Sequence, residues 1–135
     1  MINGSNPYQH LGRGFSYPFQ FENGEIKKAE YLESIKSSIK FILDTRPGEI
    51  FMMPHIGCRI WELVFSNIDP VFYSLAQEFI VGALMEQEPR ITNIRLQFLP
   101  LDPRNENKVT IIITYDVVNT GYRDNVEYVF ETQGV

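Results

Sequence analysis

The sequence has little of what a disulfide-bonded, secreted or membrane-spanning protein needs. Its single cysteine, Cys58, cannot form a disulfide within the chain. No apolar run approaches the roughly 20 residues that a helix needs to cross a bilayer, and residues 1–5 lack the basic and apolar regions of a secretory signal. We therefore expect a protein that folds in a reducing cytoplasm and has no membrane partner.

Positive charge is also scarce. The 135 residues include 12 Lys and Arg against 17 Asp and Glu, which gives a formal net charge of -5. A protein that binds nucleic acid by neutralising phosphates needs a basic surface, and no basic cluster offsets the acidic balance of this chain. The charge therefore argues against a nucleic-acid partner.

Groups that could perform catalysis or hold a metal are few. The two histidines, His10 and His55, are far apart and do not have the spacing of zinc ligands. His55 and Cys58 are three residues apart, but two possible ligands without others make a weak signal. No Gly-rich phosphate loop of the P-loop or dinucleotide-binding type is present. We predict no metal, no cofactor and no catalytic residue, and we expect Cys58 to be a small buried side chain.

A glycosidase would need a carboxylic acid of raised pKa and a second carboxylate across a cleft. Several glutamates could be nominated for these roles, but no local pattern pairs any two of them. The sequence therefore offers a hydrolase no recognisable active site. The candidates are Glu22, Glu49, Glu62 and Glu88.

The bulk composition predicts one globular domain preceded by an arm. Hydrophobic residues make up 44% and charged residues 21% of the chain, which is ordinary for a folded soluble domain. Residues 1–24 contain too many glycines and prolines for regular structure but too many aromatics for a disordered tail. We expect an extended arm that lies on a surface, either that of its own domain or that of a neighbouring subunit.

Two helices are expected before the middle of the chain. Residues 29–44 carry leucine and isoleucine at three- and four-residue spacing, with polar residues between them. Pro47-Gly48 then stops this amphipathic helix. Residues 57–65 repeat the spacing over a shorter length and predict a short, largely buried helix.

The helix with the clearest boundaries covers residues 70–87. Asp69 is a favoured N-cap, and Pro70 suits the first helical position because its missing N–H costs nothing there. Pro89 disfavours a helical conformation at Glu88 and ends the helix. The apolar surface of this helix is wider than that of a helix with one side in solvent. We therefore expect another layer or a partner to cover its second side. The residues off the main apolar face are Val71, Val81 and Met85.

The last third of the sequence changes to the two-residue period of strands. Apolar and polar residues alternate over 93–98, 109–117 and 126–130. A polar loop, 100–107, separates the first two of these stretches, and Asn119-Thr120-Gly121 supplies a turn before the third. We expect an α+β domain in which about three helices pack on one face of a small antiparallel three-stranded sheet. The exposed edges of such a sheet can accept strands from other chains.

A charged triplet, Glu88-Pro89-Arg90, stands at the sharp corner between the last helix and the first strand. By physics alone it is most simply a turn on the surface, because exposed ion pairs of this kind usually contribute little to stability. The sequence stretches before and after the triplet indicate a more specific role for it.

Several stretches, in order and at compatible intervals, resemble the small baseplate wedge proteins of contractile phage tails, tailocins and related injection machines. Members of this family are often called sheath initiators, older names for them are lysozyme-like, and a baseplate component of type VI secretion is related. The resemblance covers nearly the whole chain. It rests on Leu11 to Phe19, Thr45 to Glu49, Met53 to Cys58, Glu88 to Ile91 and, more loosely, Tyr115 to Thr120 with Arg123 and Asn125.

This resemblance implies assembly rather than catalysis. It implies an arm, 1–24, followed by a sheath-initiator domain, 25–135, in a protein that is not an enzyme. In such proteins the acid-Pro-Arg corner is understood to dock on the helical core bundle of the wedge, which two larger baseplate subunits form. A guanidinium at a rigid corner suits such docking because it can make bidentate contacts. The residues expected to bind partners are Glu88, Pro89, Arg90, Arg46, Glu49, Tyr128 and Phe130.

The resemblance also implies that the open edge of the sheet accepts strands from the first ring of sheath subunits. This β-augmentation would template sheath polymerisation. The central spike or hub is a further partner that it admits, and the sixfold symmetry of such machines implies six copies in each baseplate. The protein would assemble in the bacterial cytoplasm and then reside in the baseplate of the tail or injection particle.

Two other classes of function compete with this interpretation. One is a peptidoglycan hydrolase, as the lysozyme-like name suggests, and the other is a monomeric small-molecule-binding domain. If the corner is a surface element for docking, Arg90→Ala should leave the fold intact and abolish co-purification with the wedge subunits.

Overall fold

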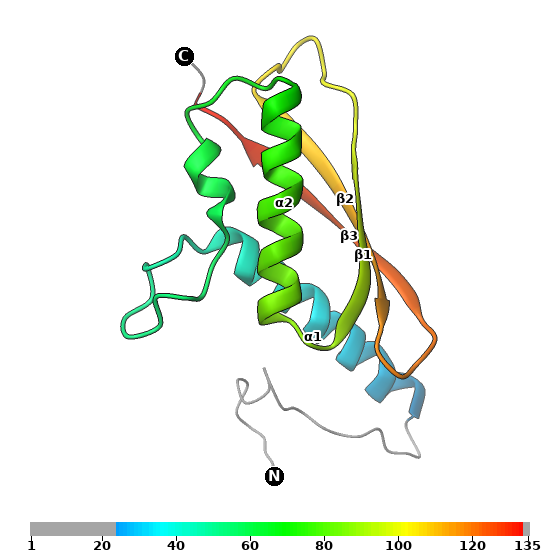
Figure 1. The fold of residues 1–135 in the computed structure, drawn as a ribbon. Coiled ribbons are helices and arrows are strands. Elements are labelled where there is room, and N and C mark those ends of the chain that lie inside the picture. The colour runs from blue at the N-terminus through cyan, green and yellow to red at the C-terminus, as the bar shows by residue number, and fades with distance from the viewer. Residues whose placement is uncertain (1–23, 134–135) are drawn as a thin grey trace. The chain divides into compact units, whose positions relative to one another are not determined.

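The computed structural model describes residues 24–133 (Figure 1). The expected arm lies outside this range, except for Gly24, which begins the first helix. The described residues divide into two units between Ser38 and Ile39, and the second contains every element after the first helix. The elements are α1 (Gly24–Asp44), the 3-10 helix η2 (Arg59–Leu63), α2 (Pro70–Gln87), β1 (Ile91–Phe98), β2 (Lys108–Val117) and β3 (Arg123–Glu131).

The α+β class is confirmed, but the expected helices differ in detail. The described residues contain two α-helices and one short 3-10 helix in place of about three helices. α1 begins at Gly24 rather than near Ala29, because the charged residues that precede the apolar period are themselves good helix formers. The apolar run 57–65 shortens to the single 3-10 segment η2, which is a common form for connections of this length.

The boundaries of α2 agree with the prediction. The Asp69 carboxylate accepts a hydrogen bond from the backbone N–H of Phe72 at 2.8 Å, and Pro70 occupies the first turn. The helix ends at Gln87, and Glu88 leaves the helical conformation. Val71 and Met85, which lie off the main apolar face, are 64% and 70% exposed, whereas Val81 is half-buried, so residues 39–133 leave most of that side of the helix uncovered.

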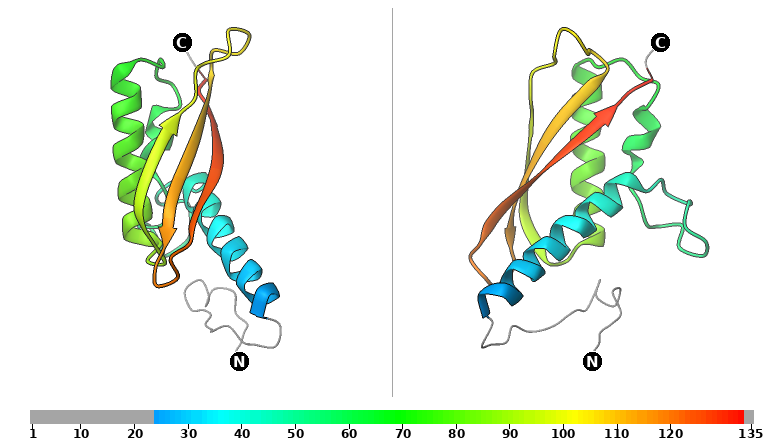
Figure 2. Two further views of the ribbon diagram at one scale, coloured as in Figure 1. Left: turned by 90° about the vertical axis from the view of Figure 1, so that its right-hand side faces the viewer. Right: turned by 180° about the vertical axis from the view of Figure 1, so that it is seen from behind.

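The three strands form one antiparallel sheet in the order β1-β2-β3, as expected. One face of the sheet is buried, and α2 lies along it (Figure 2). Two ring contacts join these layers, from Phe72 to Phe130 with centroids 6.3 Å apart and from Tyr73 to Phe98 at 5.0 Å. The residues that β2 contributes to the buried face are Val109, Ile111, Ile113, Tyr115 and Val117.

A bulge interrupts the alternation that the sequence predicts for β1. Thr92 pairs with Asp116 and Arg95 with Thr114, so that two residues of β1 lie opposite one residue of β2. Asn93 has a φ of 56°, which asparagine tolerates better than most residues, and its side chain donates to the Asp116 carboxylate at 3.0 Å. The bulge makes β1 a less regular edge than β3, whose pairing with β2 shows no shift.

Candidate partner-binding site

The two charged side chains of the Glu88-Pro89-Arg90 corner bind each other. The Nε atom of Arg90 donates to Oε2 of Glu88 at 2.7 Å, and Nη2 donates to Oε1 at 3.0 Å. The backbone N–H of Arg90 adds a third, longer bond to Oε2 at 3.3 Å. The Glu88 side chain is only 2% exposed and that of Arg90 12%. The corner is therefore held by a bidentate, largely buried ion pair.

Three elements meet at this corner. The backbone N–H of Glu88 still donates to the Leu84 carbonyl of α2 at 2.9 Å, and the Arg90 carbonyl accepts a bond from the Val118 N–H at 2.8 Å. Val118 begins the turn between β2 and β3, while Ile91, next to Arg90, is a buried residue of β1. The corner thus fixes the end of α2 to the β2–β3 hairpin.

This burial corrects the expectation that Arg90→Ala leaves the fold intact. A carboxylate that is almost fully buried needs its counter-charge, because an isolated charge in the protein interior is strongly unfavourable. The interpretation as an exposed surface turn is also wrong for the charged side chains, although Pro89 between them is exposed.

Arg46 and Glu49 lie in the loop 45–58, between α1 and η2. The Arg46 guanidinium carbon stands 4.8 Å from the centre of the Trp61 ring. The Glu49 carboxylate accepts a bond from the Arg46 backbone N–H at 2.9 Å, and the Glu49 N–H donates to the Arg46 carbonyl at 2.9 Å. Both residues are exposed, so these contacts shape a tight surface turn and leave it accessible to a partner.

The loop 45–58 is closed at its neck by a close backbone contact. The Cys58 N–H donates to the Thr45 carbonyl at 3.0 Å. The Gln87 side-chain amide makes two bonds to Gly57, accepting from its N–H at 2.9 Å and donating to its carbonyl at 2.7 Å. Because Gln87 is the last residue of α2, the neck is joined to the helix end that carries the corner.

Sequence reasoning missed this attachment. Gly57 and Gln87 are 30 residues apart, and no local pattern links a glycine in one loop to a glutamine at the end of a distant helix. The only signal available was Gly57 itself, whose φ of 128° belongs to a region that glycine alone enters readily.

Tyr128 and Phe130 do not present their side chains to a partner. The Tyr128 hydroxyl donates to the Leu43 carbonyl at 3.1 Å, and the Phe130 ring meets the Trp61 ring edge to face at 5.3 Å. Both side chains are buried, because they occupy the face of β3 that points toward the helices. The expectation that they contact partners directly is corrected: only the backbone of β3 at these positions can serve an added strand.

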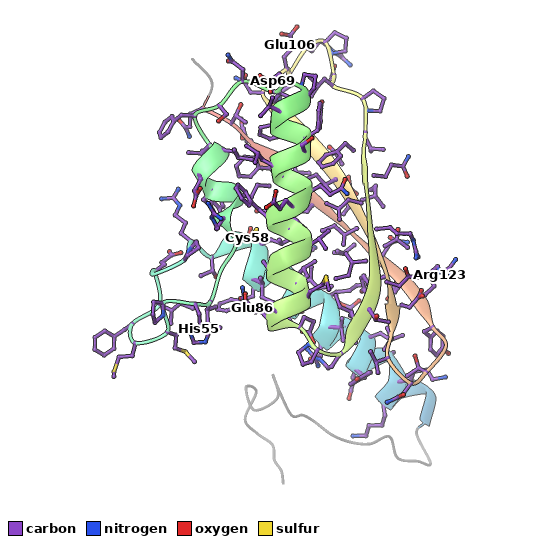
Figure 3. All side chains as sticks on the ribbon, viewed as in Figure 1. His55, Cys58, Asp69, Glu86, Glu106 and Arg123 are labelled. Carbon is purple, nitrogen blue, oxygen red and sulfur yellow. The ribbon has the colours of Figure 1, made fainter. Side chains whose placement is uncertain are left out.

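Cys58 is fully buried, as predicted, beside α2 at the neck of the loop (Figure 3). Its thiol lies 3.6 Å from the Phe79 carbonyl, and burial raises the pKa of Cys58 from 9.0 to about 11. The neutral thiol is thus the form that the folded protein holds, which is the opposite of a reactive nucleophile.

We expect native Cys58 to resist alkylation by iodoacetamide at pH 8, and to react at the rate of a free thiol once urea unfolds the chain. The raised pKa also predicts a pH dependence. Burial of the neutral thiol contributes fully to stability below pH 9. This contribution is lost as the pH rises toward about 11, because the thiol of the unfolded chain ionises first. Alkylation followed by mass spectrometry measures the reactivity of the thiol in the folded and unfolded protein, with the Cys58→Ser variant as the blank. Rapid labelling of the folded protein would contradict it.

The described residues give little support to a metal centre or to a glycosidase. Among residues 24–133, no three His, Cys, Asp or Glu side chains are placed to share a metal ion, and no helix in that range has the length and apolarity to cross a membrane. The hydrogen bond from Arg59 lowers the pKa of Glu62, whereas a general acid needs a raised one. Glu22 lies outside the described residues.

Comparison with known proteins finds one family. The family model described as "Baseplate wedge protein gp25" matches residues 29–122. Baseplate wedge protein gp25 of Enterobacteria phage T4 is 29% identical over 79 residues, which make up 58% of this chain and 60% of that protein. The match thus spans less than two thirds of the length of that relative.

Two solved structures share the fold. A protein from Geobacter sulfurreducens described as a tail lysozyme is 34% identical with a TM-score of 0.62, and the match covers 76% of this chain and 92% of that one. A chain of the baseplate complex from the type VI secretion system has a TM-score of 0.64 over 79% of this chain and 98% of its own. At 16% identity, the similarity to this second structure shows only that the fold is shared.

Proposed function

Because the chain belongs to the baseplate wedge protein gp25 family, we propose that it is a non-enzymatic component of a contractile tail or injection machine that docks on the wedge and starts the sheath. The family match over residues 29–122 carries this proposal, and the described geometry supports it. The protein would bind the larger wedge subunits at the Glu88-Pro89-Arg90 corner and offer a sheet edge to the sheath. It would assemble in the bacterial cytoplasm and remain in the finished baseplate, in six copies if the machine has sixfold symmetry.

The buried ion pair suggests how the corner would act. The Arg90 guanidinium donates two hydrogen bonds to Glu88, so its main role is to hold the shape of the corner. The exposed Pro89 stands between the paired charges and presents a rigid apolar ring. Docking would then depend on a preorganised surface, which reduces the entropy that is lost on binding.

The sheet supports strand addition at its edges. β1 and β3 are the outer strands, and within residues 24–133 no further strand pairs with either of them. The bulge at Asn93 interrupts the ladder of β1, while β3 stays in register over its whole pairing with β2. β3 is therefore the better candidate to accept a sheath strand by β-augmentation.

The docking step is tested with a double variant that removes both charges and keeps hydrogen-bonding capacity, Glu88→Gln with Arg90→Gln. We expect it to fold, because two neutral amides replace a matched pair. We also expect at least about a tenfold loss in affinity for co-expressed wedge subunits, since the weaker amide pair no longer fixes the position of the exposed Pro89 and the preorganised surface is lost. Co-purification and calorimetric titration measure the loss.

The matched control for this experiment is the exposed pair of Arg59 and Glu62, whose side chains meet at 2.9 Å in η2. Arg59→Gln with Glu62→Gln makes the same chemical change away from the corner and should bind like the wild type. If the corner variant folds and binds as well as this control, the Glu88–Arg90 ion pair does not set the docking surface.

A peptidoglycan hydrolase remains the alternative, because one similar structure is described as a tail lysozyme. Two of the nominated carboxylates are poorly placed for it. Glu88 is held by Arg90, and the Arg59 hydrogen bond lowers the pKa of Glu62. A turbidity-clearing assay on purified cell walls distinguishes the two functions, since a structural component should clear no wall material. Clearing that a single glutamate substitution abolished would overturn the structural assignment.

A further inference from the structure

The loop 45–58 ends in an exposed apolar tip, which consists of Phe51, Met52 and Met53. Their exposed fractions are 87%, 80% and 46%. The loop projects away from α2 and the sheet (Figure 1), so nothing else in residues 39–133 covers the tip. Single exposed apolar residues are common, but three large ones in a row on a projecting loop are typical of an interaction site.

The backbone holds the tip in this exposed position. The Met53 N–H donates to the Ile50 carbonyl at 3.0 Å, and the Gly48 N–H donates to the Pro54 carbonyl at 3.1 Å, across the base of the tip. Met52 has a φ of 64°, a left-handed conformation that a side chain of this kind seldom adopts. The loop thus turns tightly and keeps its apolar side chains outside, although collapse onto the domain would bury them.

We propose that the apolar tip is a second anchor, which inserts into an apolar groove on the same wedge subunit that the Glu88-Pro89-Arg90 corner contacts. This inference rests on the proposed function. The two features are linked within the fold, because the Gln87 amide bonds to Gly57 at the neck of the loop and precedes the corner by one residue. The loop is therefore attached at its neck to the helix end that carries the corner, which allows one partner to reach both.

The size of the tip favours this partner over a second copy of the chain. A buried aromatic contributes about 150–250 Å², so three side chains fall short of the roughly 800 Å² per partner that a stable interface buries. The tip alone could not hold a dimer. It suits a small, central part of a larger interface, where a few desolvated side chains dominate the binding energy.

The charges around the tip favour a protein over a lipid surface. The tip itself is uncharged, Glu49 lies just before it, and the nearest cation in the sequence, Arg46, stands over the Trp61 ring. A loop that binds anionic lipid needs clustered Lys and Arg, which this loop lacks. The occupant is therefore a protein groove lined with aliphatic side chains, to which flexible methionines can adapt.

The tip is tested with Phe51→Ser and Met52→Ser combined. Both side chains are exposed, so the variant should fold like the wild type, and we expect its affinity for the co-expressed wedge subunits to fall at least about tenfold. Phe65→Ser is the matched control, because Phe65 is 68% exposed beyond the far end of η2, and it should bind normally. An unchanged affinity of the tip variant, or an equal loss in both variants, would overturn the proposal.

A photoreactive benzoylphenylalanine at position 51 identifies the occupant. We expect crosslinks to a wedge subunit at aliphatic residues that mass spectrometry can map. Crosslinks to another copy of this chain would overturn the proposal in favour of self-association. The two proposals can fail separately: if the wild type does not bind the wedge subunits, the proposed function fails, and if only the tip variant keeps full binding, this inference fails alone.

Discussion

Arg90→Ala is expected to lower the free energy of unfolding by about 3–5 kcal/mol, the usual cost of leaving one partner of a buried ion pair alone. Arg90 supplies two side-chain hydrogen bonds and the counter-charge to Glu88, whose side chain is 2% exposed. Alanine would leave that carboxylate desolvated and without its cation. A loss of this size removes much of the roughly 5–15 kcal/mol that stabilises a typical domain.

Urea unfolding followed by circular dichroism measures this effect. Arg59→Ala is the control, because it removes an arginine from an exposed ion pair with Glu62, and exposed pairs contribute little to stability. The double variant Glu88→Gln with Arg90→Gln should lie closer to the wild type than Arg90→Ala does. If Arg90→Ala is no more destabilising than Arg59→Ala, the corner is not the buried pair that the structure describes.

Gly57→Ala is expected to destabilise the protein by about 3 kcal/mol, from the combined cost of a left-handed conformation and of overpacking. A Cβ atom at Gly57 would lie 2.7 Å from the Thr45 carbonyl oxygen and 2.8 Å from the Pro47 nitrogen. Both are backbone atoms, so neither can rotate away as a side chain could. The φ of 128° adds strain that would remain even if space were made.

Gly82→Ala is the matched control for this second prediction. Gly82 lies in the middle of α2 and is exposed, and a Cβ there meets nothing within 4 Å. Alanine should therefore stabilise the helix by about 0.5–1 kcal/mol, which is opposite in sign. Thermal unfolding of the two variants compares them directly. A Gly57→Ala protein as stable as the wild type would show that the neck of the loop 45–58 is looser than described.

Gly57→Ala would also affect binding if both proposals hold. The neck carries the bonds from the Gln87 amide, which set the position of the apolar tip relative to the corner. A displaced neck would misalign two anchors that a partner must meet together. The loss of affinity should then exceed that of either anchor's variant in a chain that still folds, because preorganisation is lost as well as contact.

The strongest predictions from sequence concerned features that a few neighbouring residues decide. Asp69 and Pro70 set the start of α2, and Pro89 set its end, because capping and proline sterics act within one turn. The two-residue alternation identified β2 and β3. The same local evidence predicted a turn at Asn119-Thr120-Gly121, where Asn119 and Gly121 both have positive φ.

Predictions about which side chains are available to a partner were less successful. Tyr128 and Phe130 were nominated through the resemblance for contacts that their burial prevents, although their alternation with polar residues already favoured the apolar face of the strand. The bulge at Asn93 was missed because its partner, Asp116, is on another strand. The Glu88–Arg90 ion pair was expected at the surface because its burial depends on residues from other elements that pack around it.

The amino-acid sequence by itself determined the type, order and limits of the main elements, since these follow from backbone preferences and periodicity over a few residues. Only the tertiary structure decided which charges are buried, which rings belong to the core and where the loop 45–58 is fastened. Those outcomes depend on contacts such as that of Gly57 with Gln87, between residues far apart in the chain, and local preferences carry no information about such pairs. The apolar tip illustrates the two contributions. Its three apolar side chains can be read from the sequence, but their exposure is a property of the fold.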